Sequence, residues 1–167
     1  MRRIIVAVGL LIATAGVGLA LAQQRSAAKV TTLSMQDYID IQQLYARYAH
    51  AIDSGARNGQ TWAETFTLDG TFGTNVGRDQ LAAFAKNWHE NRGGAQIQHW
   101  NSNLVITPAA DGAHGSCYLM LVDKRTKPTS IMSTNQYDDT LVRTAEGWRF
   151  KKRGFVPATP ASTAAAQ

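Results

Sequence analysis

The chain has 167 residues, and its 17 Lys and Arg residues against 12 Asp and Glu residues leave a formal net charge of +5 at pH 7. This length suits one domain with a real core, and so mild a charge excess without a recognition motif argues against a nucleic-acid-binding protein. The single cysteine excludes an intramolecular disulfide framework and a metal site built from paired cysteines.

The N-terminus has the pattern of a secretory signal peptide over residues 1–22. Arg2 and Arg3 precede an apolar run, and Ala20 and Ala22 are the small residues of a cleavage site. We expect cleavage after Ala22 and delivery to the periplasm or beyond, with no membrane association afterwards. The rival interpretation is a retained membrane helix, because the apolar run approaches the roughly 20 residues that span a bilayer.

A long amphipathic helix follows a small, polar segment, residues 23–33, that we expect to be a flexible tether. Ser34 and Asp37 have capping-box spacing, and a glycine at position 55 suits a C-terminal stop. Between them, apolar residues recur at helical intervals, namely Tyr38, Ile41, Leu44, Tyr45, Tyr48 and Ile52. The pattern predicts a helix over residues 34–53.

Two shorter helices are expected next. Residues 60–66 suggest a short helix, followed by a turn at Asp69 and a brief strand over residues 71–72. A third helix begins after Gly77, with an apolar stripe formed by Leu81, Phe84, Ala85 and Trp88.

The rest of the domain has the pattern of strands. Residues 95–107, 115–124, 131–144 and 148–156 alternate in polarity and are separated by turn-like residues. Helices followed by hairpin-linked strands predict an α+β domain over residues 34–156 with an antiparallel sheet. The tail over residues 157–167 consists of Pro, Ala, Ser, Thr and Gln, and we expect it to be disordered.

The order of these features resembles a known family. The segments that carry the resemblance are residues 41–45, the helix end at Asp53, residues 99–103, residues 134–137 and residues 147–153. Together they are similar to the SnoaL-like branch of the nuclear transport factor 2-like superfamily, which includes hexachlorocyclohexane dehydrochlorinase and scytalone dehydratase. The resemblance implies a cone-shaped barrel, in which a strongly curved mixed or antiparallel sheet wraps around three N-terminal helices.

The resemblance also implies a site in the cavity of the cone. In those enzymes an aspartate at the end of the first helix and a histidine on the first long strand form a dyad, and Asp53 and His99 match them. Arg153 matches an arginine that faces the cavity, where a fixed positive charge would stabilise a leaving group. Four aromatic residues are expected to line the cavity and bind substrate: Tyr45, Tyr48, Trp100 and Tyr118.

Each candidate also has an ordinary structural interpretation. Asp53 stands before Ser and Gly, as turn-forming aspartates do, and a lone strand histidine such as His99 is often only hydrogen bonded. Arg153 ends a cationic run with Lys151 and Lys152. Scytalone dehydratase uses a second histidine that residues 115–121 lack, so a two-histidine dehydration is not expected.

The sequence therefore predicts a lyase of the dehydratase or dehydrohalogenase type that needs no metal and no organic cofactor. Its substrate would be a small apolar or aromatic molecule. Two alternatives stay open: a non-catalytic module that binds small ligands or dimerises, and an accessory subunit like those of ring-hydroxylating oxygenases. By analogy with the fold, we expect a homodimer or homotrimer.

Overall fold

The computed structural model describes residues 32–93 and 95–157. In chain order these residues form α2 (Met35–Ser54), the 3-10 helix η1 (Ala56–Gly59), α3 (Gln60–Ala63), β1 (Phe66–Phe72), β2 (Asn75–Val76), α4 (Gly77–Asn91), β3 (Ile97–Ala109), β4 (Gly112–Asp123), β5 (Ser130–Thr144) and β6 (Gly147–Phe155). The expected signal peptide, most of the expected tether and the tail from residue 158 onward lie outside the described residues. Of the described helices, none is long and apolar enough to cross a membrane.

Helix α2 begins at the capping box. The Ser34 hydroxyl accepts a hydrogen bond from the Asp37 backbone N–H at 3.2 Å, and the Asp37 carboxylate accepts one from the Ser34 backbone N–H at 2.9 Å. The helix ends at Gly55, whose φ of 63° lies in the left-handed region that glycine adopts without steric cost. A side chain at Gly55 would also collide with the ring of His89. The glycine therefore lets the end of α2 approach α4 closely.

The second helix is shorter than its sequence pattern suggests. It ends at Ala63, because the chain then enters the sheet: the Thr65 carbonyl accepts a hydrogen bond from the Phe150 N–H at 3.0 Å. Phe66 pairs with Phe150 in a parallel ladder, so β1 starts at Phe66 and is longer than the strand expected over residues 71–72. A short apolar segment fits a helix or a strand equally well, and the partner strand decides between them.

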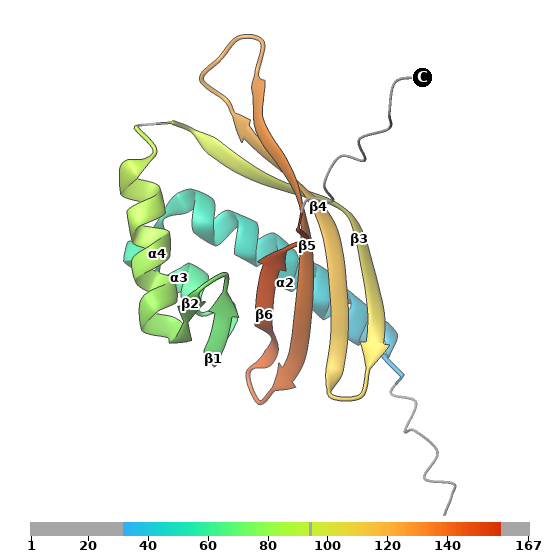
Figure 1. Cartoon of the computed structure of the whole chain (residues 1–167). Helices are drawn as coiled ribbons and strands as arrows, with labels where there is room; N and C mark the ends of the chain where they lie inside the picture. The colour runs from blue at the N-terminus through green and yellow to red at the C-terminus, as the bar shows by residue number, and fades with distance from the viewer. Residues whose placement is uncertain (1–31, 94, 158–167) are drawn as a thin grey trace, which may run out of the picture. The chain divides into compact units, whose positions relative to one another are not determined.

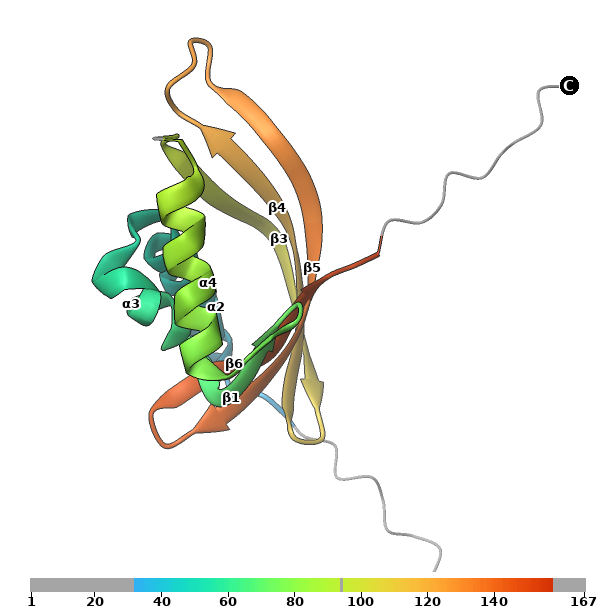
Figure 2. The same cartoon turned by 60° about the vertical axis from the view of Figure 1, so that its left-hand side comes forward.

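Six strands form one mixed sheet in the order β2-β1-β6-β5-β4-β3. The β1–β6 pair is parallel and the other neighbouring pairs are antiparallel. Figures 1 and 2 show helices α2, α3 and α4 on one side of this curved sheet. The expected α+β architecture is confirmed, with a sheet that stays open because β2 and β3, its two end strands, do not pair with each other.

Bulges account for part of the curvature of the sheet. The β3 strand is irregular between Ser102 and Val105, where Asn103 has a positive φ of 54°. A second irregularity lies in β6, where Lys151 is the extra residue opposite the consecutive residues Thr140 and Leu141 of β5. Each bulge bends its strand and increases the local twist, so the sheet curves toward the helices.

An aromatic core joins α2 to the sheet. Trp62, Phe66 and Phe150 are fully buried, and Tyr48 is buried among them. The rings of Trp62 and Phe66 lie 4.9 Å apart, and those of Tyr48 and Phe150 lie 5.5 Å apart, both at steep angles. Burial of each such side chain contributes roughly 1.5–3 kcal/mol. This packing positions the C-terminal half of α2, which carries Asp53, relative to the sheet.

Candidate functional site

Asp53 and His99 meet where the end of α2 approaches the start of β3. His99 Nδ1 lies 2.6 Å from Oδ1 of Asp53, and the His99 backbone N–H donates to both carboxylate oxygens, at 3.2 and 3.0 Å. The histidine and aspartate side chains are only 7% and 20% exposed. An ionised carboxylate only accepts hydrogen bonds, so this contact selects the imidazole tautomer that carries its proton on Nδ1 and leaves Nε2 as a base.

Two hollows flank His99. The first, which we call the inner cavity, has a volume of about 130 Å³ and lies on the concave side of the sheet. Its aromatic lining consists of Tyr48, Phe72, Phe84, Trp88, Tyr137 and Phe155. The second, the outer groove, has a volume of about 450 Å³ and lies between α2 and β3. His99 borders both hollows, whereas Asp53 borders only the outer groove. The histidine therefore lies between the outer groove and the apolar inner cavity.

Two aromatic rings pack against the imidazole of His99. The ring of Trp88 lies 5.9 Å from it and the ring of Tyr48 lies 6.5 Å from it, both edge-on. Within residues 32–93 and 95–157, Nε2 of His99 has no hydrogen-bond partner. Because Nδ1 is directed at Asp53, Nε2 lies on the opposite edge of the ring, away from the carboxylate.

Arg153 does not reach either hollow. Its side chain is 0% exposed, and its Nη1 lies 3.2 Å from a carboxylate oxygen of Asp139, which is equally buried. The Tyr45 hydroxyl donates to the same Asp139 oxygen at 2.5 Å. The guanidinium carbon lies 3.6 Å from the ring centre of Tyr137 and 4.2 Å from that of Tyr48. The expectation that Arg153 faces the cavity is therefore corrected, because these two rings, which line the inner cavity, cover it.

The Arg153 environment also perturbs its acidic partner. Burial raises the pKa of Asp139 to about 6, although the guanidinium beside it and the Tyr45 hydroxyl favour the charged carboxylate. Burial likewise raises the pKa of the neighbouring Cys117 thiol, to about 11. Both shifts follow from burial, which disfavours the charged form of each group.

The four aromatic residues expected to bind substrate have different positions. Tyr48 lines the inner cavity, while Tyr45 and Trp100 border the outer groove. The Tyr45 hydroxyl is occupied by Asp139. Tyr118 lies in neither hollow, because strand alternation turns it to the convex face of the sheet, where it is 52% exposed, while its neighbour Cys117 is buried.

Sequence reasoning missed two polar groups near His99. Trp88 had the spacing of a core residue, yet its indole Nε1 is buried and has no hydrogen-bond partner among residues 32–93 and 95–157. Tyr137 also lines the inner cavity, and its hydroxyl lies 3.5 Å from that of Tyr48. Alternation along β5 would have placed Tyr137 and Asp139 on one face, but no local signal showed that this face was the inner one.

In the part of the chain that the structure describes, no group of three or more His, Cys, Asp or Glu side chains is arranged to hold a metal ion.

Comparison with known proteins identifies the fold independently. The family model of the SnoaL-like domain matches residues 34–154. Aln2 from a Streptomyces species is 25% identical, with a TM-score of 0.67 over 75% of this chain and 94% of that chain. A Catenulispora acidiphila protein in complex with S-DNPA is 27% identical, with a TM-score of 0.62 over 71% of this chain and 92% of that chain.

A third similar structure is an NTF2-like protein with a cystatin-like fold from Novosphingobium aromaticivorans. It is 22% identical, with a TM-score of 0.67 over 76% of this chain and 85% of that chain, and at this identity the likeness concerns the fold alone. Among curated proteins, none matches the chain.

Proposed function

Because the chain belongs to the SnoaL-like domain family within the NTF2-like superfamily, we propose that it is a lyase that removes a proton from carbon in a small apolar or aromatic substrate, without a metal or an organic cofactor. The observation that carries this proposal is the 2.6 Å contact between His99 Nδ1 and the Asp53 carboxylate beside an apolar cavity. An oriented imidazole with a free Nε2 is suited to act as a general base.

The proposed step moves one proton and three electron pairs: the lone pair of Nε2, the pair of the C–H bond and the pair of the bond to the leaving group. Nε2 of His99 takes the proton from the substrate carbon, and the C–H electrons form a carbon–carbon double bond. The bond to the leaving group breaks, and the leaving group departs with the electron pair of that bond. A halide leaves as the anion and the His99 imidazolium then loses its proton to solvent, whereas a hydroxyl group takes that proton from the imidazolium and leaves as water. Asp53 stays ionised and stabilises the imidazolium. Positioned base catalysis of this kind is typically worth about 10²- to 10⁴-fold in rate.

Tyr48 and Tyr137 are the groups best placed to stabilise the leaving group. Both line the inner cavity, and burial raises the pKa of both phenols, so they stay protonated and can donate hydrogen bonds. Arg153 would then act through the Tyr137 ring beside it, as a positioning residue without direct contact with substrate.

The test uses purified protein and a panel of small cyclic β-hydroxy ketones and β-halo compounds, with loss of the substrate C–H signal followed by NMR. We expect His99→Gln to lower turnover by about 100-fold or more and Asp53→Asn to lower it as well, because the amide cannot stabilise the imidazolium. The matched control is His114→Gln, since His114 is exposed on β4 and borders neither hollow beside His99. Unchanged turnover in His99→Gln would remove the proposal.

A second candidate function is a non-catalytic module that binds small ligands. It is favoured by the two hydrogen bonds that the His99 backbone N–H donates to the Asp53 carboxylate oxygens. These bonds give the carboxylate a role in stabilising the fold that does not depend on any reaction. The Catenulispora acidiphila relative in complex with S-DNPA supports ligand binding by this fold. A ligand found by native mass spectrometry in the purified protein, together with no turnover across the panel, would favour this function over the lyase.

We propose further that the protein is exported and self-associates. The charged, apolar and small-residue pattern of residues 1–22 supports export with cleavage after Ala22. N-terminal sequencing of the protein from a periplasmic fraction tests this, because retained residues before position 23 would contradict it. Exposed Trp100 and Tyr118 on the sheet support a homodimer or homotrimer formed through that face.

A further inference from the structure

The inner cavity is small for a substrate site. Its volume of about 130 Å³ is close to that of an apolar protein cavity of about 150 Å³ that holds one benzene molecule. A single six-membered ring with small substituents therefore fits into it, whereas two fused rings do not. The size of the substrate then depends on the side chain that closes the cavity.

Phe155 closes the inner cavity on its solvent side. It is 49% exposed, whereas every other residue that lines this cavity is buried or half-buried. Its ring is stacked on that of Tyr137, with ring centres 5.0 Å apart and planes at 18°. It also meets the ring of Phe72 at a steep angle, 5.8 Å away. One part of the Phe155 ring therefore borders the cavity while another part faces solvent.

The position of Phe155 at the end of β6 leaves it outside one of the two ladders of that strand. The ladder between β1 and β6 ends at the pair Phe72 and Arg153. Beyond that pair, β6 is paired with β5, where Phe155 lies opposite Tyr137. Among residues 32–93 and 95–157, no strand pairs with the other edge of β6 at Phe155. A smaller side chain at this position would therefore open the cavity without disturbing the β1–β6 ladder.

Other walls of the inner cavity are held by further contacts. His99 is fixed by the carboxylate of Asp53. The ring of Phe84 packs against those of Trp62 and Phe72, at 5.6 and 5.2 Å. These side chains cannot withdraw without breaking hydrogen bonds or core contacts. Phe155 is thus the wall of the cavity that depends least on the rest of the core.

We propose that Phe155 determines the size of the substrate, limiting the inner cavity to a molecule with one six-membered ring. This inference rests on the proposed function in one respect, since it takes the cavity beside His99 as the substrate site. Removing the phenyl group would add its volume to the cavity, so the second ring of a larger compound would be buried instead of excluded. Specificity is a difference between two affinities, and a steric clash with one of the two ligands is enough to create it.

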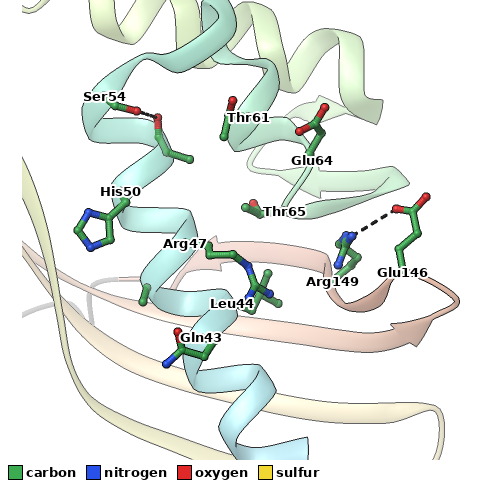
Figure 3. A pocket seen from close by; sticks show the side chains of 12 residues that line it. Gln43, Leu44, Arg47, His50, Ser54, Thr61, Glu64, Thr65, Glu146 and Arg149 are labelled. Atoms are coloured by element: carbon green, nitrogen blue, oxygen red, sulfur yellow. Dashed lines mark hydrogen bonds and ion pairs between the residues drawn. The ribbon is translucent and has the colours of Figure 1, made fainter.

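Binding of phenol and 2-naphthol tests the proposal, because these probes differ by one fused ring. The protein carries 13C-labelled Ile and Leu methyl groups, and NMR follows their signals. The methyl groups of Ile52, Leu119 and Leu121 report on the inner cavity, and those of Leu104 report on the outer groove. Leu44 reports on a larger hollow of about 690 Å³ between α2 and the β5–β6 hairpin, shown in Figure 3.

In the parent protein, we expect phenol to shift the methyl signals of the inner cavity and 2-naphthol to bind there at least about tenfold more weakly. In Phe155→Ala we expect 2-naphthol to bind at least about tenfold more tightly than it binds to the parent. This variant should fold, because Phe155 is half exposed at the end of the last strand. Val156→Ala is the matched control: it shortens the adjacent exposed side chain, which does not line the cavity, and should keep the preference of the parent.

Three results would overturn the role of Phe155. They are equal or tighter binding of 2-naphthol in the inner cavity of the parent, an unchanged preference in Phe155→Ala, and shifts that centre on Leu44 or Leu104. The lyase proposal is tested separately, because this experiment measures binding and not turnover. Size selection without turnover contradicts the lyase and leaves the role of Phe155 in place. Turnover that depends on His99, together with an unchanged preference in Phe155→Ala, overturns the role of Phe155 alone.

Discussion

Replacing Arg153 by Met tests what the buried ion pair contributes to stability. Both the Arg153 and Asp139 side chains are 0% exposed. The variant therefore leaves the Asp139 carboxylate in the core, and among the described residues the Tyr45 hydroxyl is its remaining hydrogen-bond donor. Methionine fills a similar volume, so little of the loss would come from a cavity. The substitution therefore isolates the charge of the guanidinium.

The expected loss is large compared with the stability of one domain. Removing one partner of a buried ion pair costs roughly 3–5 kcal/mol of unfolding free energy. The contact of the guanidinium with the Tyr137 ring at 3.6 Å is lost as well, and a desolvated cation–π contact is worth about 2 kcal/mol. Since domains unfold with about 5–15 kcal/mol, Arg153→Met would remove a major part of the total.

The pH dependence provides a second measurement. Burial raises the pKa of Asp139 from 3.8 to about 6, so the contribution of this carboxyl to stability is full below pH 3.8 and is lost as the pH rises through 6. Without Arg153 its pKa rises further, because the guanidinium no longer favours the charged form. The penalty of Arg153→Met is thus expected to be smaller at about pH 5 than at about pH 8.

Urea unfolding followed by tryptophan fluorescence measures both effects. The control is the double variant Arg153→Met with Asp139→Leu, which removes the pair together and should recover most of the stability. A loss below about 1 kcal/mol in the single variant, the range of exposed ion pairs, would refute the reasoning. An equal loss at both pH values would refute the assignment to Asp139.

Three other changes have defined outcomes. Asp37→Ala removes the capping box and a contact with Trp148, so we expect the unfolding free energy to fall by about 1–2 kcal/mol; an unchanged Tm would contradict this. The Ser34 hydrogen bonds hold the pKa of Asp37 below its ordinary value, so this stability is present at neutral pH and is lost as the pH falls through the lowered pKa. Because burial raises the pKa of the Cys117 thiol to about 11, the folded protein should react with DTNB far more slowly than the protein in urea, and equal rates would count against that burial. Tyr118→Arg should reduce the molar mass measured by light scattering to that of a monomer, whereas an unchanged oligomer would exclude this face as the interface.

The helices show which parts of the fold can be predicted from local sequence patterns. The capping box at Ser34 and the apolar stripe of α2 depend only on residues within a few turns, so the sequence predicted this helix and its end near Gly55. Helix α4, the third helix expected from the sequence, was predicted for the same reason. The helix α3 was predicted to be longer than it is. Phe66 instead pairs with Phe150 of β6, which is distant in the sequence, and so becomes the first residue of β1.

The candidate site, like the helices, was predicted only in part from the sequence. Resemblance to a family pointed to Asp53 and His99, but only the packing of α2 against β3 shows them 2.6 Å apart. Strand alternation could assign Arg153 to one face of the sheet. It could not show that the rings of Tyr48 and Tyr137 cover the Arg153 guanidinium on that face. The same alternation put Tyr118 and Cys117 on opposite faces without showing which face was buried.

What the sequence determined by itself was therefore local: the caps, the periodic faces, the order of helices and strands and the residue types available for chemistry. What the tertiary structure decided was which of those residues share a hollow and which share the core. The physical reason is that hydrogen bonds in a helix and side-chain alternation in a strand are set by near neighbours, whereas a cavity is what remains when distant segments pack against one another.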